Sequence, residues 1–160
     1  MKKITKKDRE IIGFLFADGC CEIIKQNIAR CYKDKVYRYI RYIPRVTVTQ
    51  REDNRKVLEY FQKRFGGYVS ENRSLKPFRT VGTFYWVAQD FERCKIITDL
   101  MIRGFIPHKK KKAAKILNQF CKWKLKSGAL TRKYTPNERE KIKKWHQQIR
   151  EINQFKGVTN

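Results

Sequence analysis

The apolar positions of the chain change their spacing several times, and each change marks the border of a predicted element. A recurrence every three or four residues predicts a helix, and an alternating or short continuous run between turn residues predicts a strand. Helices are expected over residues 8–19, 53–65 and 91–103, and two more begin at Pro107 and at the capping box of Thr135 and Glu138. Strand pairs are expected over residues 21–50 and 68–88. This order predicts an α+β fold, αββαββα, with extra C-terminal helices.

The first predicted helix has almost no polar face, so we expect it to be buried nearly all round. Its apolar residues are Ile11, Ile12, Phe14, Leu15 and Phe16. Asp18 and Gly19 close it, and Gly19 is expected in the left-handed conformation that ends many helices. The helix dipole repels a carboxylate at this end, and a divalent cation would cancel that penalty. Asp18 is therefore a candidate metal ligand, although a simple helix-ending Asp-Gly turn fits the same residues.

The long strand pair has two faces of different chemistry, because residues two apart in a strand share a face. One face carries Arg41, Ile43, Arg45, Thr47 and Thr49, and the opposite face carries Ile40, Tyr42, Val46 and Val48. The second set is typical of a core. The first set could read base edges in a major groove, since arginine bonds guanine and aliphatic groups contact thymine methyls. An ordinary solvated face is the alternative, but residues 38–50 contain no acid.

Charge makes nucleic acid the first partner to consider. The chain of 160 residues has 39 Lys and Arg against 15 Asp and Glu, a net charge of +24, which favours a surface for a polyanion. Acidic substrates and anionic membranes remain alternatives. With 41% hydrophobic residues, we expect a single folded domain, residues 1–160, with a core over about 4–126 and a last helix over about 136–154. No apolar stretch is long enough for a membrane span, and no signal peptide is evident.

Two further groups of residues have candidate roles. Lys109, Lys110, Lys111 and Lys112 stand at the start of a predicted helix, where cations are unfavourable unless an anion such as phosphate offsets them. A solvated helical turn is the alternative. The cysteines are Cys20, Cys21, Cys31, Cys94 and Cys121. Their odd number and the lack of a C-x-x-C pair favour reduced, buried thiols in an intracellular protein over a zinc site.

Residues 11–19, Ile-Ile-Gly-Phe-Leu-Phe-Ala-Asp-Gly, resemble the LAGLIDADG motif that names a family of homing endonucleases. Gly13, Ala17, Asp18 and Gly19 match its letters, and the order of elements resembles the family's fold from about residue 4 to 123. Phe16 departs from the motif, where the family usually has its first acid. The resemblance implies an intron-encoded endonuclease that hydrolyses phosphodiesters of double-stranded DNA with Mg²⁺ or Mn²⁺. Its antiparallel sheet would form a saddle on a long pseudo-palindromic site.

The resemblance also implies roles for individual residues. Asp18, Gln50 and Lys109 would be catalytic, Asp18 and Gly19 would hold the metal, and Arg51 or Arg55 could add a second basic group. Because the chain has one motif, it would act as a homodimer through Ile12, Gly13, Phe16 and Ala17. The implied DNA contacts are Glu22, Ile24, Gln26, Arg30, Arg38, Arg41, Ile43, Arg45, Thr47, Ser70, Asn72, Arg73, Arg79, Thr83, Tyr85, Lys110 and Lys111.

Two other functions fit the same fold. One is an RNA maturase that assists intron splicing, and the other is a DNA-binding protein that does not cleave. The presence of Asp18, Gln50 and Lys109 favours the nuclease, because a pure binder does not need the acid. The expected location is the cytoplasm of a prokaryote or the interior of an organelle.

Overall fold

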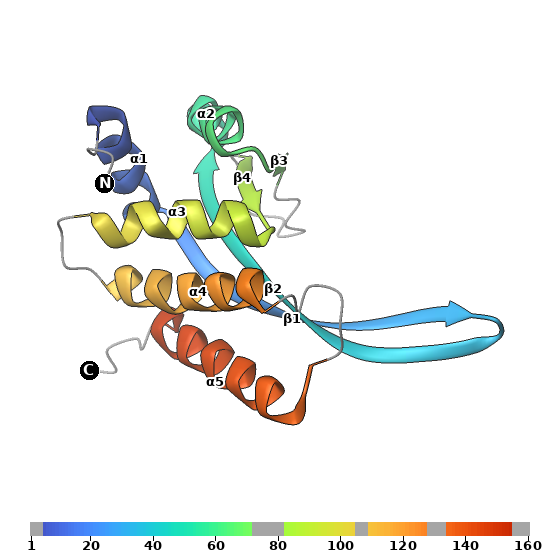
Figure 1. Cartoon of the computed structure of the whole chain (residues 1–160). Coiled ribbons are helices and arrows are strands. Elements are labelled where there is room, and N and C mark those ends of the chain that lie inside the picture. The colour runs from blue at the N-terminus through green and yellow to red at the C-terminus, as the bar shows by residue number, and fades with distance from the viewer. Residues whose placement is uncertain (1–4, 72–81, 105–108, 128–133, 155–160) are drawn as a thin grey trace, which may run out of the picture.

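The computed structural model describes residues 5–71, 82–104, 109–127 and 134–154, and within them the chain is an α+β protein (Figure 1). The elements are α1 (Lys6–Ala17), β1 (Gly19–Tyr32), β2 (Lys35–Arg51), a 3-10 turn η1 (Glu52–Asn54), α2 (Arg55–Phe65), β3 (Tyr68–Glu71), β4 (Thr83–Ala88), α3 (Phe91–Arg103), α4 (Lys109–Lys126) and α5 (Pro136–Asn153). The four strands form one antiparallel sheet in the order β1-β2-β4-β3. The predicted fold class is confirmed.

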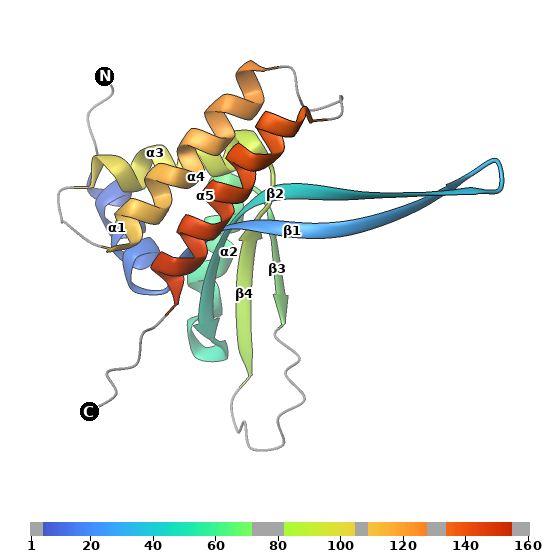
Figure 2. The same ribbon diagram turned by 90° about the horizontal axis from the view of Figure 1, so that it is seen from below.

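The predicted hairpin is present and dominates the shape of the molecule. β1 and β2 pair without interruption from Gly19 opposite Val48 to Tyr32 opposite Lys35. Lys33 and Asp34 make the turn with φ values of 45° and 58°, the conformation that two-residue hairpin turns require. The outer half of the hairpin runs far beyond the helices (Figures 1 and 2). It is exposed on both faces, and its side chains are therefore open to a partner.

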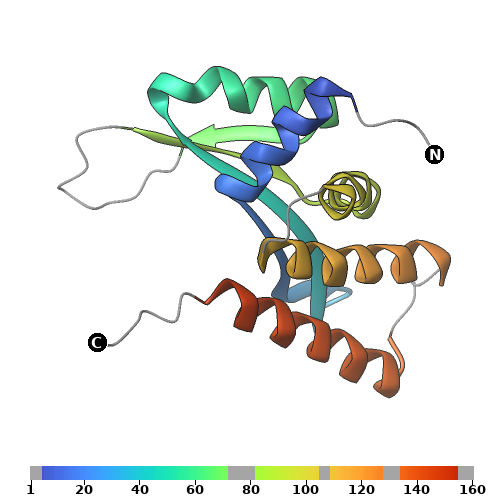
Figure 3. The same cartoon turned by 90° about the vertical axis from the view of Figure 1, so that its left-hand side faces the viewer.

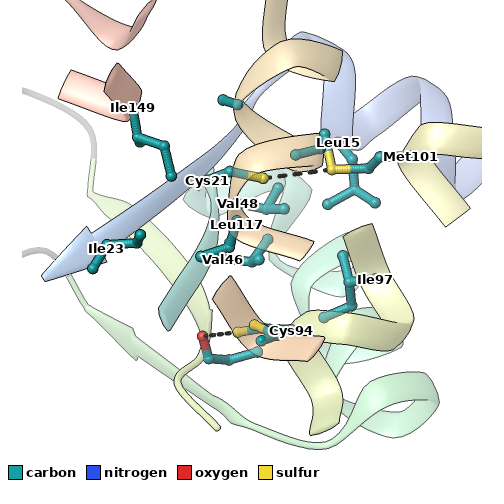
Figure 4. Packing of buried hydrophobic residues seen from close by; sticks show 14 of the residues in the cluster. Leu15, Cys21, Ile23, Val46, Val48, Cys94, Ile97, Met101, Leu117 and Ile149 are labelled. Atoms are coloured by element: carbon teal, nitrogen blue, oxygen red, sulfur yellow. Dashed lines mark hydrogen bonds between the residues drawn. The ribbon is translucent and has the colours of Figure 1, made fainter. Parts of the chain in front are cut away.

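The helices pack against one face of the sheet, as the alternation of burial along β2 shows. Val46 and Val48 are 0% exposed, whereas Arg45 and Thr47, which alternate with them, are half-buried on the opposite face. Trp86 of β4 joins the core and donates its indole N–H to the Gly66 carbonyl at 2.8 Å. Figure 3 shows α3, α4 and α5 beside one another, and Figure 4 shows their apolar side chains meeting those of the sheet. The opposite face thus remains available for another role.

Two expectations about the first helix are wrong. It is not buried nearly all round, because Gly13, Phe14 and Ala17 are exposed, while Leu15 and its neighbours on one side are buried. Nor does Gly19 adopt a left-handed conformation. Among the described glycines, Gly66 and Gly67 have the positive φ values of that conformation. Gly19 is needed for a different reason: a Cβ there would lie 2.4 Å from the Leu15 carbonyl oxygen. Close approach, rather than φ, fixes this residue.

The cysteines follow the expectation in part. All five are free thiols, and Cys21, Cys94 and Cys121 are buried, but Cys20 is half-buried and Cys31 is exposed on the hairpin. Burial raises the pKa of the Cys121 thiol to about 12, so it stays protonated. The described helices include none long and apolar enough to cross a membrane.

Gly67→Ala tests the packing between α2 and the sheet. The residue has φ 83°, and a Cβ there would lie 2.2 Å from the Val87 carbonyl oxygen. We expect the free energy of unfolding to fall by about 2–4 kcal/mol, since left-handed strain and overpacking each cost about 1–3 kcal/mol. Gly13→Ala is the control, because its Cβ would meet nothing within 4 Å. Urea denaturation at equal protein concentration gives both values, and equal losses of stability would contradict the prediction.

Candidate nucleic-acid interface and metal centre

The end of α1 brings two of the predicted catalytic residues together. Asp18 is the C-cap of α1 and is exposed to solvent. The Gln50 Nε2 donates a hydrogen bond of 2.6 Å to the Asp18 Oδ2. Gln50 is near the end of β2, where it lies opposite Phe84 of β4, so the sheet fixes its place. The geometry therefore anchors a carboxylate at a point where the helix dipole alone would repel it.

The lysine beside this carboxylate is Lys110. Its Nζ donates to the Ala17 carbonyl oxygen at 2.6 Å, at the C-terminal end of α1. Burial lowers the pKa of Lys110, and the charge of the nearby Asp18 acts in the opposite direction. Lys109, which the sequence analysis places in the catalytic set, is the first residue of α4 and is exposed. The structure thus provides a contact between α1 and Lys110 that the sequence did not indicate.

The lysine run is partly compensated from within the chain. Lys111 directs its Nζ to the Gly104 carbonyl oxygen, at the C-terminal end of α3. Lys110 does the same at the end of α1. Helix C-termini carry partial negative charge, so these carbonyls offset part of the repulsion at the start of α4. Two of the four lysines therefore have internal partners, and the expected role of an external anion at this helix start stays a prediction.

The predicted DNA contacts that the structure describes fall largely on one face of the sheet. The pairs Glu22–Arg45, Ile24–Ile43 and Gln26–Arg41 lie opposite one another in the hairpin, and Ser70 lies opposite Tyr85 in the β3–β4 pair. Partners in an antiparallel pair share a face, and that face alternates along each strand. By the same rule Arg30, Thr47 and Thr83 belong to this face, which we call the open face.

Six of the predicted contacts are not among these residues. Lys110 and Lys111 belong to α4. Arg38 pairs with Ala29 and belongs to the face opposite the open face. Asn72, Arg73 and Arg79 lie outside the described residues. Conversely, the predicted contacts leave out other residues of the open face, among them Ile28, Tyr37, Tyr39 and Thr49. Each of these residues is an even number of positions from a predicted contact in the same strand and therefore shares its face, so the sequence pattern alone could have identified them.

Arg45 is held in place by an acid on the neighbouring strand. Its Nη2 lies 2.9 Å from the Glu22 Oε2, and the two side chains are 34% and 29% exposed. The Arg45 Nε is buried and has no hydrogen-bond partner within the described part of the chain. A guanidinium has five N–H donors in one plane, so the bond to Glu22 orients it and still leaves donors for a base edge.

The exposed side of α1 differs from the predicted interface. Ile12 and Phe16 are 7% and 9% exposed and pack within the chain, next to Gly104 at the end of α3. Gly13 and Ala17 are exposed, and Phe14 between them is 38% exposed. These three residues recur at helical spacing and form one stripe. Two of the four predicted interface residues thus serve the core of the chain itself.

The residues at the end of α1 fit a hard divalent cation. Asp18 offers carboxylate oxygens and Gly19 follows it at the start of β1. Mg²⁺ is usually held by one or two carboxylates, with water and substrate phosphates completing its shell. Within the described residues, no three His, Cys, Asp or Glu side chains cluster as a closed metal site. An ion held by Asp18 would therefore need further ligands from water, substrate or a second chain.

Solved structures with the same architecture are DNA endonucleases. The archaeal intron-encoded homing endonuclease I-Vdi141I, in complex with DNA, superposes with a TM-score of 0.68 at 18% identity, over 93% of this chain and 85% of that one. I-CvuI, in complex with an I-CreI target and Mg, gives 0.68 at 18% identity, over 96% and 85%. The chain has the homing-endonuclease fold. The sequence itself matches no family model and no curated protein.

A third structure with the homing-endonuclease fold matches over a different share of its length. The meganuclease I-SmaMI, bound to uncleaveable DNA, gives a TM-score of 0.64 at 15% identity. The match covers 88% of this chain but 43% of the I-SmaMI chain. The present chain therefore corresponds to less than half of that protein.

Lys110→Met tests whether this lysine caps α1. We expect the free energy of unfolding without DNA to fall by about 1–2 kcal/mol, because the variant cannot form a charge-assisted hydrogen bond at a half-buried position. Lys112→Met is the matched control, since Lys112 is exposed in the same helical turn. Urea denaturation measures both. Equal stability of the two variants would show that the bond to Ala17 contributes nothing.

Proposed function

We propose that the chain is a metal-dependent, site-specific DNA endonuclease of the LAGLIDADG type that works as a homodimer. The observation that carries the proposal is the end of α1, where Gln50 holds the Asp18 carboxylate at 2.6 Å and Lys110 contacts Ala17. A carboxylate, an amide and an ammonium group meet there beside a basic sheet. A protein that only binds DNA gains nothing from a carboxylate directed toward phosphates.

The open face is the proposed DNA surface. A two-stranded ribbon fits the major groove of B-DNA, which is about 12 Å wide. The face offers arginine and glutamine donors at Arg41, Arg45 and Gln26. Ile24 lies between these donors along β1, and Ile28 follows Gln26. Arginine reads guanine and aliphatic groups contact thymine methyls. The net charge of +24 supplies the sequence-independent attraction.

The chemistry needs no nucleophilic side chain. When bound, Mg²⁺ or Mn²⁺ lowers the pKa of a water ligand and neutralises charge on the phosphodiester. Asp18 would hold the ion through its carboxylate, together with the Gly19 backbone carbonyl. Gln50 orients that carboxylate by its hydrogen bond. Lys110 places a positive charge next to the end of α1, where it would offset the negative charge that develops on the phosphate. Lys109 is the alternative source of this positive charge.

A second copy would complete the site. One chain contributes one Asp18, and cutting both strands of a duplex calls for two such carboxylates. The stripe of Gly13, Phe14 and Ala17 is exposed and contains two small residues, which permit close approach of helix backbones. A two-fold axis along this stripe would bring two α1 C-termini together. The match to less than half of the I-SmaMI chain supports an assembly of two units.

Asp18→Asn tests the nuclease assignment. Plasmids carrying randomised inserts are incubated with the protein and Mg²⁺, and linearised molecules are sequenced to find the site. On that site we expect the variant to cleave at least about 100-fold more slowly, a typical effect of removing one electrostatic group from a reaction centre. DNA affinity should be kept or increase, because a negative charge next to phosphates is gone. Equal cleavage rates would overturn the assignment; binding without cleavage by the natural sequence would favour the non-cleaving function.

Gly13→Leu tests the dimer. A leucine at this exposed position would separate two α1 helices that cross there, so we expect sedimentation to show monomers. Gly13→Ala is the control and should leave the dimer intact, since it adds a single methyl group. The circular dichroism of both variants should match the natural chain, because Gly13 has no side-chain neighbour within 4 Å in the chain itself. A Gly13→Leu dimer as tight as the original would place the interface elsewhere.

A further inference from the structure

A groove runs between β1 and α5, at the edge of the sheet. It has a volume of about 610 Å³, and the side chains that matter here are Lys25, His146, Arg150 and Asn153. Glu22 and Ile24 of the open face also line it. The groove therefore begins at the proposed DNA surface and continues to the C-terminal helix, which lies next to β1 in Figure 2. Neither the motif nor the proposed catalytic centre gives α5 a role.

The backbone of β1 faces this groove with polar groups. β1 is the edge strand of the sheet, and the Asn153 Nδ2 donates to the Cys21 carbonyl oxygen at 2.9 Å. That carbonyl therefore points away from β2. In an antiparallel strand the N–H and C=O of one residue point to the same side, and alternate residues repeat the direction. Ile23 and Lys25 accordingly present their backbone N–H groups to the groove.

The side chains add positive charge from both walls. Lys25 comes from β1 and Arg150 from α5, and both are exposed. His146 lies between them with its ring against Tyr42, the centroids 5.9 Å apart. Burial is the main cause that lowers the pKa of His146, and the charges of Arg150 and Lys25 add to it. The carboxylate that lines the groove, Glu22, is bonded to Arg45. The groove thus concentrates cations and N–H donors.

The groove lies along the outer edge of the strand pair that we propose to enter the major groove. When the face of a β-ribbon lies in the major groove, its edges point to the sugar-phosphate strands that border that groove. We propose that the groove between β1 and α5 binds a backbone phosphate of DNA, through Lys25, Arg150, protonated His146 and the edge N–H groups of β1. This inference rests on the proposed DNA-binding function. In this arrangement α5 would hold the phosphate backbone of the duplex next to β1, and we call this contact the clamp.

Arg150→Gln in the full chain tests the clamp. Binding to a fluorescein-labelled duplex of mixed sequence, about 30 base pairs long, is followed by anisotropy from about 50 to 200 mM salt. We expect the affinity to be about 3- to 10-fold weaker. In a plot of the logarithm of the affinity against the logarithm of the salt concentration, the slope should be flatter by about 0.9 for each phosphate that the variant no longer neutralises. Lys144→Gln is the matched control, an equal change of charge at an exposed position on another side of α5. The affinity of the control should fall less, because no groove surrounds it.

His146→Gln provides a second readout that a purely structural role would not give. In the unbound protein His146 is neutral near pH 7, since its pKa is lowered, whereas a phosphate in the groove favours the charged form. DNA binding then takes up a proton, so affinity should rise as the pH falls from about 8 to 6. The variant should lack that part of the pH dependence. Among the described residues, Lys25 and Arg150 act on the ring by their charge, Tyr42 contacts it, and Glu22 and Cys20 are the other titratable groups that line the groove.

The outcomes separate the clamp from the proposed function. If the natural chain does not bind the duplex, the proposed DNA-binding function fails. If it binds, but Arg150→Gln equals Lys144→Gln and His146→Gln leaves the pH dependence unchanged, the clamp is overturned and the function stands. Competition by inorganic phosphate at millimolar concentration that disappears in Arg150→Gln would support the clamp, because it would show that a phosphate and the duplex use the same site. Phosphate that binds through Arg150 without weakening DNA binding would show a site for free anions and would overturn the clamp.

Discussion

The position of the α1 C-terminus is the constraint on which the rest of the molecule depends. Three contacts define it. Gln50 donates a hydrogen bond to Asp18, and Lys110 donates one to the Ala17 carbonyl oxygen. At Gly19 the start of β1 passes close to α1, where a Cβ would lie 2.4 Å from the Leu15 carbonyl oxygen. These contacts come from β2, α4 and β1. The carboxylate is therefore fixed relative to the sheet and to the lysine-rich helix together. A shift of one element would move the proposed reaction centre relative to the DNA surface.

Much of the fold, and part of the site, could be predicted from the sequence. Periodicity is a local property, so the hairpin, the capping box of Thr135 and the helix Phe91–Arg103 are where the pattern predicts them. The motif resemblance selected both Asp18 and Gln50, and the structure joins their side chains by a hydrogen bond of 2.6 Å; their catalytic roles stay predictions. The alternation along β2 also contained the information that separates Arg38 from Arg41, although the prediction of DNA contacts did not apply that rule strictly.

Other features depend on contacts between distant segments, and no local pattern encodes them. An apolar helix is expected to be buried, but α1 leaves Gly13 and Phe14 exposed because the chain itself covers one side. Nothing in four consecutive lysines indicates that Lys110 is the one that reaches Ala17, where it reduces the repulsion at the start of α4. The groove of α5 depends on the side chain of Asn153 reaching the backbone of Cys21, which is 132 positions earlier in the sequence.

The few acids of the chain explain how a net charge of +24 is tolerated and why DNA would stabilise it. Several of the described acids join different elements: Asp8 contacts Arg64 between α1 and α2, and Asp99 contacts Lys122 between α3 and α4. Glu22 likewise holds Arg45 across the hairpin. The remaining cations repel one another, and this repulsion raises the free energy of the folded state. A polyanion on the open face would remove it, so folding and the proposed DNA binding would reinforce each other by mass action. The same charge that weakens the isolated chain thus strengthens the proposed complex.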